Sequence, residues 1–382
     1  MSKCAVLILS ISLFFISCKK DDVKNDVGSV ATVANPTEGQ IVLSTYGTTT
    51  SPSLLLILDK SGNTVFKKTV SVAAYNFKKW QVNGKTRYTY IEFDSTAFKI
   101  TTTGSINAGT GVVLNESFQE IKRLRLLPFN GRSASDPTGI DSHEFLYLDD
   151  NHFITLSYFQ KPVNNIPASL NPLSNCLVVA PIVQEILNDK VVFEWDGTQY
   201  PEFYQQSVES NAFSDPKVIH DYMHMNSIIV DPTDNNLICS LRHLNQIIKI
   251  SRVDGHIIWR LGGTNSTFPM TAATKFLRQH NATLTDNNRT LLMIDNGDAK
   301  ERPFTRIMEF HFNANQTSID SSSVFTLPMN TFVQYTGSVQ KKGDTYFVSC
   351  GGTLKLMEVN YKTSQISFLM NLTNACYRAY KD

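Results

Sequence analysis

Short apolar runs separated by polar turns recur along the chain from about residue 39 onward. The runs are about four to eight residues long, rich in Val, Ile, Phe and Tyr, and bounded by Asp, Asn and Gly, which is the pattern of strands joined by hairpin turns. Apolar periodicity of the helical kind never continues for more than about two turns. The pattern therefore predicts an all-β protein.

The runs group into six successive units. In each unit an apolar strand, a turn and a second strand are followed by another such pair. Four strands in each of six units are typical of a six-bladed β-propeller, whose blades surround a central channel. A two-domain β-sandwich and an irregular β-helix are the alternatives, and the even spacing of the units disfavours the sandwich. The units span 39–70, 77–113, 143–195, 224–263, 279–327 and 336–372.

Two longer segments, 114–142 and 196–223, interrupt these units. We expect them to form loops on one face of the ring. Loops on a rigid scaffold commonly carry function, so these segments are candidates for a functional role. Trp195 and Trp259 occupy matching ends of their units. We therefore expect both indoles to pack between blades and not to bind a ligand.

The N-terminus carries the chain's one long apolar run, 12 residues over 5–16, behind Lys3. This is the pattern of a secretory signal and is too short for a membrane span. Its end at Cys18 resembles a bacterial lipobox, although Phe15 and Ile16 depart from the usual residues. An ordinary cleaved signal with a chance cysteine is the alternative.

These features divide the chain into three parts. We predict a lipoprotein signal peptide over 1–17, a flexible polar tether over 18–36 and the propeller over 37–382. Lipidation of Cys18 would anchor the exported protein to a bacterial membrane, facing the periplasm or the cell surface.

Composition excludes several functional classes. The 382 residues contain 35 Lys plus Arg against 34 Asp plus Glu, so the basic excess needed for nucleic-acid binding is missing. A hydrophobic content of 42% is too high for a disordered chain. Beyond the signal the cysteines are scattered without a Cys-x-x-Cys pair, so we expect no zinc site. Whether disulfides form, and between which cysteines, stays open; the four are Cys176, Cys239, Cys350 and Cys376.

Three histidines occupy equivalent places in successive units. His143, His224 and His280 each start the first strand of a unit. In a propeller that strand lines the channel, so the three side chains should converge at one mouth. The turn centred near residue 233 pairs His224 with Arg242 across the hairpin, and Asn226 lies on the same face as His224.

Histidines, an arginine and an asparagine suit two kinds of ligand. Three imidazoles can hold a metal ion, but the adjacent guanidinium of Arg242 disfavours a second cation. A sulfate or phosphate group fits better, because arginine offers two donors to two oxygens at once. A neutral imidazole can also attack sulfur or phosphorus as a nucleophile. We therefore expect an anion site without a metal.

The segments 221–263 and 276–297 together resemble the bacterial arylsulfate sulfotransferases. They contain, in order, a His-x-Asn-Ser element, a Ser-x-Arg element, an Ile-x-Trp-x-Leu-Gly stretch, a Gln-His pair and an Asp-Asn-Gly turn. The segment 143–158 resembles the family's upstream histidine element. The resemblance extends over 39–372 and is strongest in 221–297.

The resemblance implies sulfuryl transfer from a phenolic sulfate ester to a phenolic acceptor, without a cofactor or a nucleotide sulfate donor. The family proceeds by ping-pong through a sulfated histidine, which would be His280. His143, His224 and Arg242 would bind the sulfuryl oxygens. One of the site histidines other than His280 would move the phenolic proton. The further candidate substrate-binding residues are Asn226 and Asn296.

This sequence departs from the family in two respects. We expect the extra N-terminal β-sandwich of some relatives to be absent or reduced to a strand, and no closely spaced cysteine pair is visible. A homodimer and the choice of acceptor therefore stay open. The alternative function is a non-catalytic lipoprotein propeller that binds an anionic, for instance sulfated, ligand or a partner protein. A phosphoesterase-like hydrolase is a third reading of the same pocket.

The remaining five histidines have no place in this site. His243 and His256 lie beside or within turns, so we expect exposed side chains. His152, His220 and His311 have no equivalents in other units and receive no role.

Overall fold

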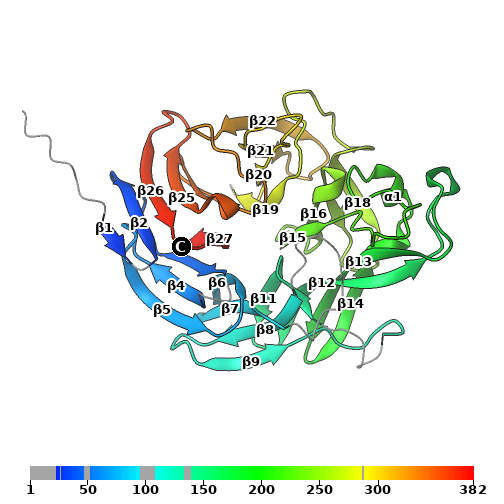
Figure 1. Cartoon of the computed structure of the whole chain (residues 1–382), viewed down its shortest axis with the longest axis horizontal. Helices are drawn as coiled ribbons and strands as arrows, with labels where there is room; N and C mark the ends of the chain where they lie inside the picture. The colour runs from blue at the N-terminus through cyan, green and yellow to red at the C-terminus, as the bar shows by residue number, and fades with distance from the viewer. Residues whose placement is uncertain (1–22, 26, 47–51, 95–107, 133–138, 286–287) are drawn as a thin grey trace, which may run out of the picture.

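The computed structural model is a closed ring of six antiparallel β-sheets, which confirms the six-bladed propeller (Figure 1). It describes residues 23–25, 27–46, 52–94, 108–132, 139–285 and 288–382. Cys18 and the expected signal peptide lie outside the described residues. No helix within the described ranges is long and apolar enough to cross a membrane.

Blades 3, 4 and 5 are four-stranded sheets made of consecutive strands, as the units predict. Blade 3 contains β11 (Phe145–Asp149), β12 (His152–Val163), β13 (Cys176–Leu187) and β14 (Lys190–Asp196). Blade 4 contains β15 (Met225–Val230), β16 (Leu237–Leu241), β17 (Gln246–Ile250) and β18 (Ile257–Gly262). Blade 5 contains β19 (His280–Thr285), β20 (Thr290–Asp295), β21 (Arg306–Phe312) and β22 (Ile319–Thr326).

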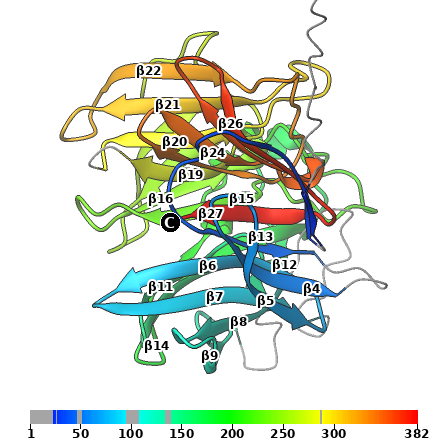
Figure 2. The same cartoon turned by 90° about the vertical axis from the view of Figure 1, so that its left-hand side faces the viewer.

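Blade 1 takes its innermost strand from the far end of the chain. Its order is β27-β3-β4-β5, so the ring is closed by a strand beyond the last predicted unit. Figure 2 shows β27, in red, running through the middle of the molecule. The strands of this blade are β3 (Ile41–Thr45), β4 (Ser53–Leu58), β5 (Thr64–Val70) and β27 (Cys376–Lys381).

Blade 2 corrects the expectation that 114–142 forms only a loop. That segment contains β9, which pairs with β8, and β10, which pairs with the other end of β8. β9 has the sequence EIKRL, with largely exposed side chains, and its charges hide the strand from a search for apolar runs. The strands are β6 (Ala74–Val82), β7 (Lys85–Phe93), β8 (Ala108–Leu114), β9 (Glu120–Leu124) and β10 (Ile140–Asp141).

Blade 6 corrects the predicted tether. Residues 28–33 form β2, which pairs with β26, so this part of the expected tether belongs to the propeller. Val30 packs against the apolar core of the blade, and a side chain at Gly28 would come within 2.2 Å of the Asn371 carbonyl oxygen. The strands are β1 (Val23–Asn25), β2 (Gly28–Val33), β23 (Ser338–Lys342), β24 (Thr345–Ser349), β25 (Lys355–Asn360) and β26 (Ile366–Leu372).

Short helical turns occur in the connections. The link 196–223 is mostly irregular, as expected, apart from η2 and the one-turn helix α1. A 3-10 turn, η3, joins β16 to β17 beside the three histidines. These elements are η1 (Ala168–Leu170), η2 (Gly197–Gln199), α1 (Glu202–Gln206), η3 (Arg242–Leu244) and η4 (Gly351–Thr353).

The apolar core lies between neighbouring blades. Trp195 belongs to a buried cluster drawn from blades 3 and 4, and Trp259 packs 5.5 Å from Phe312 of blade 5, measured between ring centroids. Both indoles therefore pack between blades, as predicted. Burial of each such side chain contributes about 1.5–3 kcal/mol to stability. The four cysteines that the structure describes are free and buried, which answers the open question of their pairing.

Candidate functional site

The structure brings the three repeat histidines together at the starts of the inner strands. His143 precedes β11, His224 precedes β15, and His280 is the first residue of β19. The His143 ring lies 4.9 Å from that of His224 and 6.1 Å from that of His280, between centroids. All three are less than 10% exposed.

Local irregularities in the strands aim these side chains at the channel. The pairing of β15 with β16 shifts register between Met225 and Ser227, and that of β19 with β20 shifts between His280 and Thr283. Such β-bulges re-aim side chains next to active sites. His224 itself has a left-handed backbone, with φ of 48°. The histidines therefore face one another instead of alternating along a regular strand.

His280 is held as a neutral ring with its lone pair on Nε2. Its Nδ1 lies 2.8 Å from the Gly337 carbonyl oxygen, which can only accept, so Nδ1 carries the proton of the neutral ring. The Tyr377 hydroxyl donates to Nε2 at 3.0 Å. Burial, assisted by the charge of Arg378, lowers the pKa of His280 well below its usual value. The ring is therefore neutral at pH 7, with an unprotonated Nε2 that faces the cluster.

The other two histidines each face a carboxylate. Nδ1 of His143 bonds to Asp141, and Nδ1 of His224 lies 2.6 Å from Asp221 Oδ2. Each carboxylate accepts a hydrogen bond from Nδ1, which fixes the tautomer and orientation of the ring. Burial nevertheless lowers the pKa of His143, against the effect of Asp141. The sequence analysis missed both acids, although each stands within three residues of its histidine.

β27 brings two further residues into the site that the sequence analysis also missed. The Tyr377 ring lies 5.3 Å from that of His280 and 5.4 Å from that of His143. Arg378 is fully buried, 3.0 Å from Glu144, and also donates to the Asn226 carbonyl. Burial lowers the pKa of His143 and His280, and the positive charge of Arg378 lowers both further.

Arg242 lies opposite His224 as the hairpin geometry predicts, and its backbone N–H donates to the His224 carbonyl at 3.0 Å. The guanidinium of Arg242 points toward Glu209. Nη1 lies 3.3 Å from each carboxylate oxygen of Glu209, and Glu209 also pairs with Arg278 at 2.8 Å. Arg242 therefore stands beside the cluster with its charge engaged by an acid from the 196–223 link.

The two asparagines hold neighbouring segments together. Asn226 donates to the Gln279 carbonyl at 2.7 Å, next to His280. Asn296 donates to the carbonyls of Val333 and Thr336 at 2.6 and 3.1 Å. These bonds position the site. Substrate binding by either amide stays a prediction.

His243 corrects an expectation of exposure. Its side chain is buried, and its ring stacks on that of His224 at a centroid distance of 4.7 Å, while Nδ1 bonds to the Asp221 carbonyl. The cause is η3, which turns the connection inward. The side chain of His256 is 62% exposed, as expected.

The side chains of Asp221, His224 and His243 have the spacing of a metal site, with one ligand atom from each within 4.8 Å of the others. Hydrogen bonding explains this arrangement, because Nδ1 of each ring faces an oxygen of Asp221. Arg242 adds positive charge beside them, which opposes a bound cation. The absence of a metal from the reaction stays a prediction.

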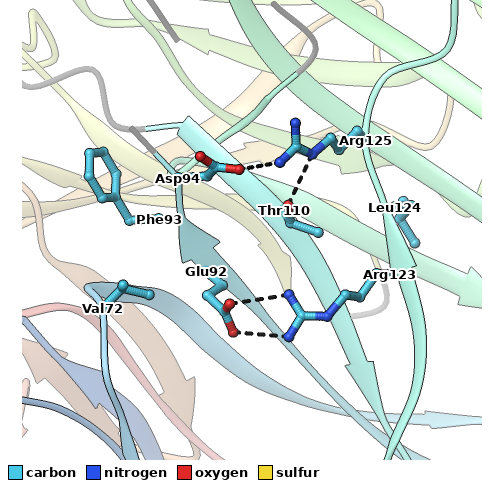
Figure 3. Close-up of a pocket in the computed structure, with 8 residues that line it drawn as sticks. All are labelled: Val72, Glu92, Phe93, Asp94, Thr110, Arg123, Leu124 and Arg125. Carbon is cyan, nitrogen blue, oxygen red and sulfur yellow. Dashed lines mark hydrogen bonds and ion pairs between the residues drawn. The ribbon is translucent and has the colours of Figure 1, made fainter. Parts of the chain in front are cut away.

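The described part of the ring contains cavities in at least two places. One of about 630 Å³ lies in blade 2, where Glu92 pairs with Arg123 and Asp94 with Arg125 (Figure 3). These charges neutralise one another, and no predicted site residue lines it. The second, of about 750 Å³, lies between blades 4 and 5 and is lined by Glu209, so it reaches the residue that engages Arg242.

The free energy of unfolding should fall as pH drops below about 6.5, the value of an unperturbed histidine. Burial lowers the pKa of His243 to about 4, and those of His143 and His280 also fall. The unfolded chain then binds protons first, so stability present above pH 6.5 is lost toward acid. One such histidine contributes about 2 kcal/mol between pH 6.5 and 5.

Urea denaturation at stepped pH measures this loss. His243→Gln should flatten the dependence, whereas His256→Gln, at an exposed position, should leave it unchanged. Equal slopes in the wild type and His243→Gln would show that this histidine does not contribute.

Comparisons with known proteins give one family match and several structural likenesses. A family model described as arylsulfotransferase (ASST) matches residues 26–381. No curated protein matches the chain. A periplasmic gluconolactonase from Pseudomonas aeruginosa is similar in structure, with 11% identity, a TM-score of 0.48 and coverage of 90% of this chain and 99% of that one. A protein of unknown function from Bacteroides caccae has 9% identity, a TM-score of 0.47 and coverage of 90% and 99%. These two likenesses carry no conclusion about activity.

Proposed function

The chain belongs to the arylsulfotransferase family, and from this premise we propose that it moves a sulfuryl group from a phenolic sulfate ester to a phenolic acceptor through a sulfated His280. The observation that carries the proposal is the state of that ring. A buried imidazole is fixed with its proton on Nδ1, and its Nε2 lone pair accepts a hydrogen bond from the Tyr377 hydroxyl. This is what a nitrogen nucleophile needs.

In the first half-reaction, Nε2 of His280 attacks the sulfur of the donor. The N–S bond forms as the bond between sulfur and the aryl oxygen breaks, and the phenolate leaves with the electron pair. A doubly protonated ring of His143 or His224 keeps its Nδ1–H on Asp141 or Asp221. Its Nε2–H then donates to a sulfuryl oxygen.

Proton transfer completes each half-reaction. His224, held by Asp221, is placed to give a proton to the departing phenolate and to take one from the acceptor phenol. Tyr377 must release Nε2 of His280 as sulfur approaches, which frees its hydroxyl to bond to the phenolic oxygen. The acceptor oxygen then attacks sulfur, the N–S bond breaks, and His280 returns to its neutral form.

The sequence pattern supports a location for this chemistry. We propose that the protein is exported and held at a bacterial membrane by a lipid on Cys18, with small aryl sulfates and phenols as its partners. The support is the apolar run over 5–16 that ends in Ser17-Cys18. Metabolic labelling with a fatty acid, lost in Cys18→Ser, tests this anchor.

The direct test is incubation of the purified protein with an aryl sulfate, with and without a phenol. We expect phenol release that the acceptor accelerates, and intact-mass measurement should show a sulfated protein when the acceptor is omitted. If the protein binds aryl sulfates without release or adduct, the non-catalytic propeller is the correct reading. Release without an adduct, unaffected by phenol, would indicate a hydrolase.

A further inference from the structure

The anion position beside Arg242 is already filled by a carboxylate of the protein. Glu209 lies 3.3 Å from Arg242 Nη1, 2.8 Å from Arg278 Nε and 3.6 Å from His243 Nε2. Its side chain is only 24% exposed. Burial alone would raise the pKa of Glu209, but Arg242, His243 and Arg278 outweigh it and lower the pKa. The Glu209 carboxylate therefore occupies this site as a bound anion would, although it is covalently part of the chain.

The same donors would hold a sulfate group. Sulfate and carboxylate oxygens accept hydrogen bonds from guanidinium groups in the same way. The two groups differ in the number of oxygens that they offer. Glu209 serves Arg242, Arg278 and His243 with two oxygens, whereas a sulfate ester presents three non-bridging oxygens and can form an additional hydrogen bond with these donors.

We propose that Glu209 occupies an oxyanion site beside the histidine cluster and is displaced when the sulfate of the donor first binds there, which makes it a specificity-determining residue. The proposal rests on the proposed function and adds a rule of selection to it. A carboxylate ligand gains nothing over Glu209, which is already tethered in place. Only a tetrahedral oxyanion, such as a sulfate or phosphate monoester, makes enough additional bonds to displace it.

The surroundings allow Glu209 to move. It belongs to an irregular segment between α1 and β15, and its neighbour Val208 is 56% exposed. The cavity of about 750 Å³ begins at Glu209 and is also lined by Lys275 and Lys300. A displaced carboxylate can therefore enter solvent-accessible space beside two ammonium groups. Burial of the histidines to less than 10% exposure means that some group must move before a donor can enter.

Calorimetric titration with inorganic sulfate and with benzoate tests the proposal. Glu209→Gln keeps the shape of the side chain and removes its charge. We expect it to bind sulfate at least about fivefold more tightly than the wild type does, on the scale of one partly exposed ion pair. Benzoate should bind to Glu209→Gln and not to the wild type.

Glu202→Gln is the matched control. Glu202 lies at the start of α1 and pairs with Arg260 at 2.9 Å, away from the histidines, so its loss removes the same charge from a nearby segment. Tighter sulfate binding in both variants would show that the change in net charge alone explains the effect, and would overturn the proposal. Unchanged or weaker binding in Glu209→Gln, with its unfolding midpoint intact, would also overturn it.

These binding measurements need no turnover, so they separate the two proposals. If no sulfated protein ever forms but Glu209→Gln still gains sulfate and benzoate binding, the displaced carboxylate is supported and the transferase is not. If the sulfated protein forms and Glu209→Gln changes nothing, only the role of Glu209 fails.

Discussion

Replacement of His280 by asparagine is expected to abolish the sulfated protein and to lower turnover of an aryl sulfate by about four orders of magnitude or more. The asparagine amide can still donate to the Gly337 carbonyl, so the fold of β19 should survive. It lacks the nitrogen lone pair that attacks sulfur. Intact-mass measurement after a single turnover, together with the rate of phenol release, reports both effects.

His256→Asn is the control for this substitution, because it makes the same chemical change at an exposed position. It should leave both the adduct and the rate unchanged. An adduct of undiminished amount in His280→Asn would assign the nucleophile to another residue. His143 would then be the next candidate, because its ring lies 6.1 Å from that of His280.

Replacement of Arg378 by methionine should lower the free energy of unfolding by about 3–5 kcal/mol. Both partners of the Arg378–Glu144 ion pair are almost completely buried, 3.0 Å apart. Removal of the guanidinium leaves the Glu144 carboxylate buried without its counter-charge and the Asn226 carbonyl without its donor. Urea denaturation measures the loss.

The double variant Arg378→Met/Glu144→Gln separates the pair from simple loss of packing. It removes the stranded charge, so it should recover much of the lost stability. A double variant as unstable as Arg378→Met would show that packing, and not charge, dominates. The pKa of His280 should rise toward its ordinary value in either variant, because Arg378 lowers it. Titration of that ring by NMR tests this independently.

The sequence predicts the parts of the fold that repeat. Alternating apolar runs identify six units, and the place of each histidine at the start of a unit predicts that the rings meet. Hairpin symmetry also places Arg242 opposite His224, because register follows from the centre of the turn. Strands made of charged residues, such as β9, carry no such signal. β27 was missed because its partner β3 lies at the other end of the chain.

The orientation of side chains within the site could not be predicted from the sequence. Register says which residues are neighbours, but the rotamer of Arg242 depends on Glu209, which comes from an irregular link without periodicity. Asp141 and Asp221 stand near their histidines in sequence, yet their contact with Nδ1 depends on backbone geometry just before the strands. Burial of His243 follows from η3, which a turn-like sequence does not distinguish from an exposed turn.

Closure of the ring by β27 ties the chemistry to the order of synthesis. β3 is made early, but its inner edge has no partner until residues 376–381 exist, more than 300 positions later. The same strand delivers Tyr377, whose hydroxyl contacts His280, and Arg378, whose charge lowers the pKa of that histidine. The surroundings of the proposed nucleophile are therefore complete only after β27 has been made.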